Sequence, residues 1–239
     1  MSVYIKMQRT FFNIYRSKKQ DEDVYADHSL FKIGRIPKVF VWTRHLQEVR
    51  IQGRQGTSLA HVGALMMEWK QRKTDKKIIK MSPQYLYNLR EDKESNQMCA
   101  RELMEIMQKN GCCPEKDLPH GILENTAESN ESAAQNKIPG YGRILTIKAL
   151  QRAINVYGPC LMVFPVYNFN IHMWKQHEGE ERLGGHAFAV VGYNAKGFIL
   201  RNSWGAHWNG NGHTLYPYKD WGLHEEAWTI MDDSKINQW

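Results

Sequence analysis

Two separate segments of this chain contain the residue types that amide hydrolysis requires. Ser58 supplies a hydroxyl nucleophile, and Gln52, six residues earlier, supplies an amide that can donate to a developing oxyanion. His186 supplies an imidazole base, and Asn202, sixteen residues later, can accept from the other ring nitrogen and fix its tautomer. Together the four residues predict acyl transfer through a covalent intermediate, provided that the fold brings the two segments together.

The stretch 184–212 predicts a hairpin that places His186 beside Asn202. An apolar strand at 187–193 follows the histidine, an Asn-Ala-Lys-Gly turn follows the strand, and a second strand at 198–201 ends just before Asn202. We expect Trp204 to cover the contact between the imidazole and the amide and to keep water away from it.

Ser58 is predicted to lie at the N-terminus of a helix. From this residue to about position 73, apolar side chains recur at spacings of three and four: Leu59, Val62, Leu65, Met66 and Trp69. Backbone N–H groups point outward at a helix start, where the helix dipole favours negative charge. Gly53 and Gly56 allow the preceding loop an unusual backbone path.

The remaining pattern predicts an α+β protein with a helical first half and a β-rich second half. We expect helices from Ser82-Pro83 to about 90, from about 99 to 110, and from the Thr146 cap to about 157. Further strands are expected at 160–167, 213–216 and 228–231, and residues 112–140 are expected to form a long loop.

Composition limits the classes of function. The net charge of +7 is concentrated in residues 1–80, with 17 Lys/Arg against 7 Asp/Glu, which is compatible with a solvated basic surface or with an adaptor for an acidic partner. No nucleic-acid-binding motif, membrane-spanning run or secretory signal is evident, and the four cysteines lack CxxC spacing. We therefore expect an intracellular protein, cytoplasmic or virion-associated, with neither nucleic acid nor membrane as a partner.

No metal or cofactor is expected. His172 and His177, or His207 and His213, could be imagined as metal pairs, but a third ligand at a clear spacing accompanies neither pair. The vicinal Cys112-Cys113 pair is expected to be a buried or loop thiol pair rather than a redox centre.

The segments GGHAFAVVGY and FILRNSWGAHW resemble the catalytic His and Asn segments of the papain-like (C1 family) cysteine peptidases, and QGRQGTS resembles that family's QGxCGSC segment. The resemblance covers roughly residues 36–231 in the family's order. It implies a two-lobed papain-like fold, with a helical left lobe, a β-barrel-like right lobe and the active-site groove between them. By position it implies that His186 is the catalytic histidine, Asn202 its orienting partner, Gln52 the oxyanion glutamine and Trp204 the shielding tryptophan. It further implies that Gly185 contacts the substrate.

A closer resemblance is to the compact bacterial and viral branch typified by xylellain, on SPQYLYNLRED, GCCPEKDLPH, HTLYPY and AWTIMD. It suggests that residues 1–35 are a short, pro-segment-like N-terminal extension that lies in or near the groove. The peptidase domain would then span 36–239, with a helical lobe at about 52–140 and a β-rich lobe at about 141–231.

The chain departs from the family's pattern at four places. The nucleophile position holds Ser58 instead of cysteine, Gln55 replaces a disulfide cysteine, Leu59 stands where many members have tryptophan, and no Gly-Gly pair is evident between Asn96 and Cys99.

A serine hydroxyl does not form the thiolate–imidazolium pair, so we expect this form to be inactive or very weak. Three interpretations remain open. The protein is a cysteine peptidase scaffold with an engineered serine, a natural pseudopeptidase that binds peptides or a partner, or an enzyme in which Ser58 is a working nucleophile. A peptide or protein substrate is the expected ligand.

Overall fold

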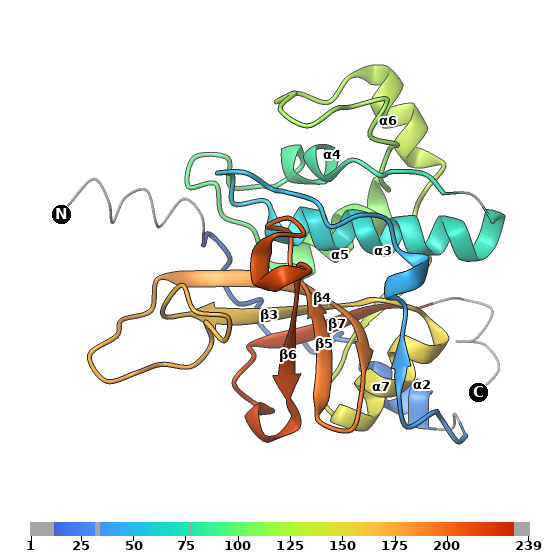
Figure 1. Ribbon diagram of the computed structural model, residues 1–239. Coiled ribbons are helices and arrows are strands. Elements are labelled where there is room, and N and C mark those ends of the chain that lie inside the picture. Colours follow the sequence, from blue (N-terminus) through green and yellow to red (C-terminus); the bar gives the residue numbers. More distant parts are fainter. Residues whose placement is uncertain (1–11, 32–33, 77, 232–239) are drawn as a thin grey trace.

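The computed structural model describes residues 12–31, 34–76 and 78–231, and Figure 1 shows the course of the chain. The helices are α2 (Ala26–Phe31), α3 (Ser58–Asp75), α4 (Pro83–Asn88), α5 (Ala100–Lys109), α6 (Ala127–Ala134) and α7 (Ile147–Val156), with 3-10 turns at Thr43–His45, Trp208–Gly210 and Tyr218–Asp220. The strands are β1 (Phe40–Val41), β2 (Gly140–Arg143), β3 (Cys160–Val166), β4 (Gly184–Tyr193), β5 (Gly197–Arg201), β6 (His213–Pro217) and β7 (Glu226–Met231). Among these residues, no helix combines the length and the apolar character needed to cross a membrane.

Several helices begin where the sequence predicts a cap. The Ser82 hydroxyl accepts a 3.0 Å hydrogen bond from the Tyr85 N–H at the start of α4, and Pro83 occupies the first turn. Thr146 caps α7 in the same way, at 3.2 Å from the Ala149 N–H. Helix α3 begins at Ser58 as predicted and ends at Asp75, and its C-cap residue Lys76 adopts the left-handed conformation.

The prediction of a featureless loop over residues 112–140 is wrong, because this region contains α6 and the start of β2. Helix α6 is held by a capping box in which the Thr126 side chain accepts from the Ser129 N–H at 3.1 Å and the Ser129 side chain accepts from the Thr126 N–H at 2.9 Å. Of its eight residues only Ser129 and Ala133 are buried, so the sequence shows no apolar period that would reveal the helix.

The described strands form an antiparallel sheet in the order β2-β7-β3-β4-β5-β6, with β1 paired to β4. Alternate residues of β3 and β4 face two different cores, as the two-residue period of a strand requires. Val163, Ala187 and Ala189 pack with α3, α4 and α5, whereas Phe164 and Phe188 pack on the other face with α2 and α7. Figure 1 shows the corresponding arrangement, with α3 to α6 on one side of the sheet and α2 and α7 on the other. This is the predicted α+β architecture with two lobes.

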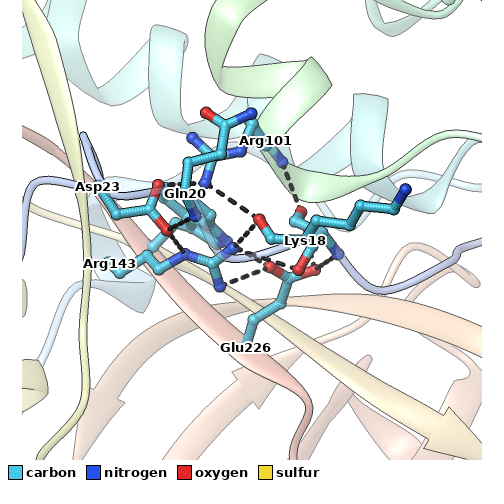
Figure 2. Close-up of polar contacts among 8 residues, drawn as sticks. Lys18, Gln20, Asp23, Arg101, Arg143 and Glu226 are labelled. Carbon is cyan, nitrogen blue, oxygen red and sulfur yellow. Dashed lines mark hydrogen bonds and ion pairs between the residues drawn. The ribbon is translucent and has the colours of Figure 1, made fainter.

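The described part of the N-terminal extension is attached to the body through a buried ionic cluster (Figure 2). This anchor cluster consists of Ser17 and Asp23 from the extension and of Arg101, Arg143 and Glu226 from α5, β2 and β7. Arg143 contacts Asp23 at 2.8 Å and Glu226 at 3.2 Å, and Arg101 also pairs with Asp23. The Ser17 hydroxyl donates to Glu226 at 3.1 Å.

The charges of the anchor cluster compensate one another in a dry environment. Burial acts to raise the pKa of Asp23, but hydrogen bonds from Arg101 and from the Gln20 backbone, together with the charges of Arg143 and Arg101, hold it below its ordinary value. Arg143 also lies over the Trp228 ring, 4.3 Å from its centroid. The cluster therefore joins the extension to both halves of the molecule. Residues 1–11 and 32–33 of the predicted extension lie outside the described residues.

We predict that Asp23→Ala destabilises the protein by about 3–5 kcal/mol, because it removes the carboxylate that pairs with Arg101 and one of the two that pair with Arg143. Urea unfolding at neutral pH measures the change. Glu48→Gln is the control, since it removes an exposed ion pair with Lys80, and it should leave the free energy of unfolding unchanged. Equal effects of the two substitutions would contradict the role given to the anchor cluster.

Candidate active site

His186 and Asn202 are brought together by the pairing of β4 with β5, as the sequence predicts. His186 is the third residue of β4, and Asn202 directly follows β5. The imidazole Nε2 lies 2.8 Å from the Asn202 Oδ1. Both side chains are buried, His186 completely and Asn202 at 3% exposure.

The tautomer of His186 follows from the bonds that Asn202 makes. Asn202 Oδ1 also accepts a 2.8 Å hydrogen bond from the Ser203 N–H, which only the carbonyl oxygen of the amide can do. The ring nitrogen that faces this oxygen must therefore carry a proton, and in the neutral ring the lone pair resides on Nδ1. Nδ1 is buried and has no hydrogen-bond partner among the described residues.

Burial decides the charge of this imidazole. It lowers the pKa of His186 to about 4, against the opposing effect of the Asn202 hydrogen bond. His186 is thus a neutral base at pH 7, with an available lone pair on Nδ1.

Ser58 is fully buried at the first residue of α3. Its Oγ accepts a 3.3 Å hydrogen bond from the N–H of Ala187, the residue after His186. The start of the helix is thereby attached to the histidine strand, so the two segments that the sequence singles out do meet.

Gln52 is attached to the asparagine segment. Its backbone N–H donates to the Ser203 carbonyl at 2.8 Å, and its Oε1 accepts from the Ser203 hydroxyl at 2.6 Å. With the oxygen fixed in this way, Nε2 is directed away from Ser203 and donates to the Gln55 carbonyl at 2.8 Å, which leaves one N–H for a further acceptor. Sequence reasoning missed Ser203; its position next to Asn202 in the NSW segment was the available signal.

Aromatic rings cover the histidine. The Trp204 ring centroid lies 4.8 Å from that of His186, which is the covering position predicted for it. The Phe12 ring packs edge-on against His186 at 6.1 Å and lies 6.3 Å from Trp204. Phe12 is 3% exposed, so it shields the imidazole from the side of the N-terminal extension.

Residues 12–16, here called the strap, run between the two halves at this site. The Gly185 N–H donates to the Phe12 carbonyl at 3.3 Å on the sheet side, and the Met98 N–H donates to the Asn13 carbonyl at 3.4 Å on the helical side. A Cβ on Gly185 would come within 2.7 Å of the Ile14 carbonyl oxygen, so glycine is required for this approach. Gly185 therefore contacts an extended backbone segment, and here that segment belongs to the chain itself.

The other sequence candidates do not form a site. Among the described residues, no group of three or more His, Cys, Asp or Glu side chains is arranged to hold a metal ion. Within the same part of the chain, Cys99, Cys112, Cys113 and Cys160 are buried free thiols. Burial raises the pKa of Cys113 and of Cys160 to about 12, which makes both thiols unreactive at neutral pH.

The neutral state of His186 predicts a pH dependence of stability. Because its pKa is lowered on folding, its contribution is complete above the unfolded value of about 6.5 and is lost as the pH falls through about 4. His186→Gln keeps a donor for Asn202 and should reduce the slope of unfolding free energy against pH by up to about 1.4 kcal/mol per pH unit. Urea unfolding across this range measures the slope, with the exposed His45→Gln as control. If His186→Gln leaves the slope unchanged, the imidazole is not held neutral.

The papain family cysteine protease model matches residues 36–228. Mouse cathepsin K is 28% identical over 202 residues, covering 76% of this chain and 60% of cathepsin K. An uncharacterized peptidase C1-like protein of Acanthamoeba polyphaga mimivirus is 42% identical over 67 residues, 26% of this chain and 21% of that protein. The chain thus spans less than two thirds of the length of either relative.

Among solved structures, the cysteine protease xylellain from Xylella fastidiosa has the same fold, with a TM-score of 0.81 and 22% identity over 94% of this chain and 97% of xylellain. The family match covers most of the chain, and it includes all the candidate catalytic positions, from Gln52 and Ser58 to His186 and Asn202. The chain belongs to the papain family of cysteine proteases.

Proposed function

We propose that the chain is a papain-type endopeptidase scaffold whose chemistry is carried by position 58, His186, Asn202 and Gln52. The observation that carries the proposal is the pair of bonds at Asn202 Oδ1, which leaves the His186 lone pair on Nδ1. That nitrogen belongs to the residue just before Ala187, whose N–H contacts the Ser58 Oγ. Base and nucleophile position are therefore neighbours.

Each residue has one role in the proposed reaction. The nucleophile at position 58 attacks the scissile carbonyl carbon, and the oxyanion receives hydrogen bonds from Gln52 Nε2 and from the backbone N–H of residue 58. His186 transfers a proton to the leaving amine, which gives an acyl-enzyme, and then activates the water that hydrolyses it. Asn202 holds the ring orientation throughout.

Serine changes the first step. A thiol next to the imidazole ionises before attack, whereas the Ser58 hydroxyl must lose its proton to His186 during attack. Asn202 has no charge with which to stabilise the resulting imidazolium. We infer that the Ser58 form is inactive or very weak, whether the serine is encoded by the gene or introduced by engineering.

A second candidate function is peptide or partner binding without cleavage, as in a pseudopeptidase. Ser58 itself favours it, since this is the one of the four catalytic positions that departs from the family's residue type. Both functions use the same groove and differ only in whether an acyl intermediate forms.

Restoring the thiol separates the two functions. Ser58→Cys should react with a peptidyl epoxide and cleave members of a peptide library, with a gain of several orders of magnitude over the Ser58 form. Mass spectrometry detects the adduct and the cleavage products. Ser58→Cys/His186→Ala is the control and should lose both reactions. A folded Ser58→Cys protein that neither labels nor cleaves would favour the pseudopeptidase.

We further propose that the strap keeps the site latent. Phe12 packs on His186 and Trp204, and the backbone of residues 12 and 13 uses N–H donors on both halves that an extended substrate would need. The anchor cluster holds the following residues in place, so opening requires the strap to leave while Ser17 and Asp23 stay bound.

Phe12→Ala in the Ser58→Cys background should raise the rate of epoxide labelling about tenfold or more, because the strap loses most of the apolar burial that holds it over His186. Time-resolved mass spectrometry measures the rate. The matched control is Lys19→Ala, an exposed position between the strap and Asp23. Identical rates for the parent and Phe12→Ala would show that the strap does not limit access.

A further inference from the structure

A basic hollow of about 310 Å³ opens next to the strap. Its walls come from residues 54–56, from the end of α4 and the segment that follows it, and from Leu123. Three of its lining side chains are cations, namely Arg54, Arg90 and Lys93, and none of the described residues that line it carries a carboxylate. The lining of the hollow therefore contains three positive charges and no negative charge.

Arg90 is fixed in the wall of this hollow. Its Nη1 donates to the Tyr87 carbonyl at 2.8 Å and its Nη2 to the Asn96 Oδ1 at 2.7 Å, and its guanidinium lies 4.0 Å from the Tyr87 ring centroid. Its Nε is buried and has no partner among the described residues. A guanidinium held in one orientation suits an anionic ligand, since little side-chain entropy is lost on binding.

Asp92 and Glu102 interact with Arg90 through their charges, but neither carboxylate lines the hollow. Asp92 lies on the same loop but accepts from the N–H and the hydroxyl of Ser95, the former at 2.8 Å. Glu91 and Glu94, also on this loop, are exposed and are absent from the lining of the hollow. The three cations thus line the hollow, whereas the carboxylates of the loop do not.

The strap places a carboxamide at the groove side of the hollow. Asn13 Nδ2 donates to the Tyr87 hydroxyl at 3.2 Å and to the Asn96 carbonyl. The side chain also lies against Gly56, where a Cβ would come within 2.3 Å of Asn13 Nδ2. Asn13 is 3% exposed, and its Oδ1 is buried without a partner among the described residues. Three lining residues of the hollow thus contact a short polar side chain whose oxygen lacks a donor.

The position of the hollow relates it to the reacting bond. Gln55 and Gly56 line it, and they belong to the loop between Gln52 and Ser58. The carbonyl under attack must lie between Gln52 and residue 58, so the substrate residue that carries this carbonyl lies next to this loop and next to the hollow.

We infer that this hollow is the subsite for an acidic side chain, Asp or Glu, on the acyl side of the cleaved bond. The inference rests on the proposed peptidase function and adds a substrate class to it. Arg90 supplies the fixed donor, and the exposed Arg54 and Lys93 supply attraction that salt weakens.

A cleavage-site profile tests the inference. The full-length Ser58→Cys protein is incubated with a peptide library, and acyl-side Asp or Glu should exceed Asn or Gln by about tenfold in kcat/KM. Arg54→Glu/Lys93→Glu should abolish this preference, measured as the ratio of kcat/KM for acyl-side Asp or Glu to that for Asn or Gln. Lys70→Glu/Lys73→Glu is the control, because it makes the same charge change on α3 away from this hollow.

The outcomes separate the subsite from the peptidase activity. Cleavage without an acidic preference, or with one that Arg54→Glu/Lys93→Glu leaves unchanged, would overturn the subsite and leave the peptidase function in place. If no library member is cleaved, the peptidase function fails. Binding of acidic and amide peptides to the Ser58 protein then tests the hollow alone, and equal binding overturns the inference. Inorganic phosphate that binds through Arg54 and Lys93 while acidic peptides show no preference would identify a free-anion site instead.

Discussion

The hydrogen bond between His186 Nε2 and Asn202 Oδ1 is the constraint on which the rest of the site depends. It requires β4 and β5 to pair across their turn, which Asn194 closes by accepting from the N–H groups of Lys196 and Gly197 at 2.8 and 3.2 Å. It also requires the Asn202 amide to be oriented, and the Ser203 N–H does this. Because both partners are buried, the bond fixes the tautomer and leaves one lone pair for chemistry at position 58.

Position 58 is brought next to the histidine strand by packing rather than by proximity in the sequence. Helix α3 packs its apolar face on β4, which brings its first residue to the Ala187 N–H. Ser203 then extends the same arrangement to Gln52. Phe12 of the strap covers the histidine and excludes water from it. This burial lowers the pKa of the imidazole. The neutral, covered base is therefore a consequence of the closed state.

The sequence predicted the features that depend on local signals. Caps at Ser82 and Thr146 revealed α4 and α7, and the apolar runs around His186 and Asn202 revealed the hairpin that joins them. The sequence did not predict helix α6, because this helix has almost no apolar face. It did not predict strand β2 either, because this strand is a four-residue GYGR segment defined by its pairing with β7. The anchor cluster and the contacts of Asn13 could not be predicted, since their partners lie 78 to 209 and 74 to 83 residues away in the chain.

Nitrogen-15 NMR of the His186 ring, compared between the Ser58 protein and Ser58→Cys, tests the central claim most directly. The account predicts that the Ser58 protein at pH 7 contains a neutral ring protonated on Nε2. It predicts that Ser58→Cys contains an imidazolium, because a thiolate next to Nδ1 raises the pKa of His186 above 7. A ring that is neutral in both proteins, or protonated on Nδ1 in the Ser58 form, would contradict the pairing of position 58 with His186.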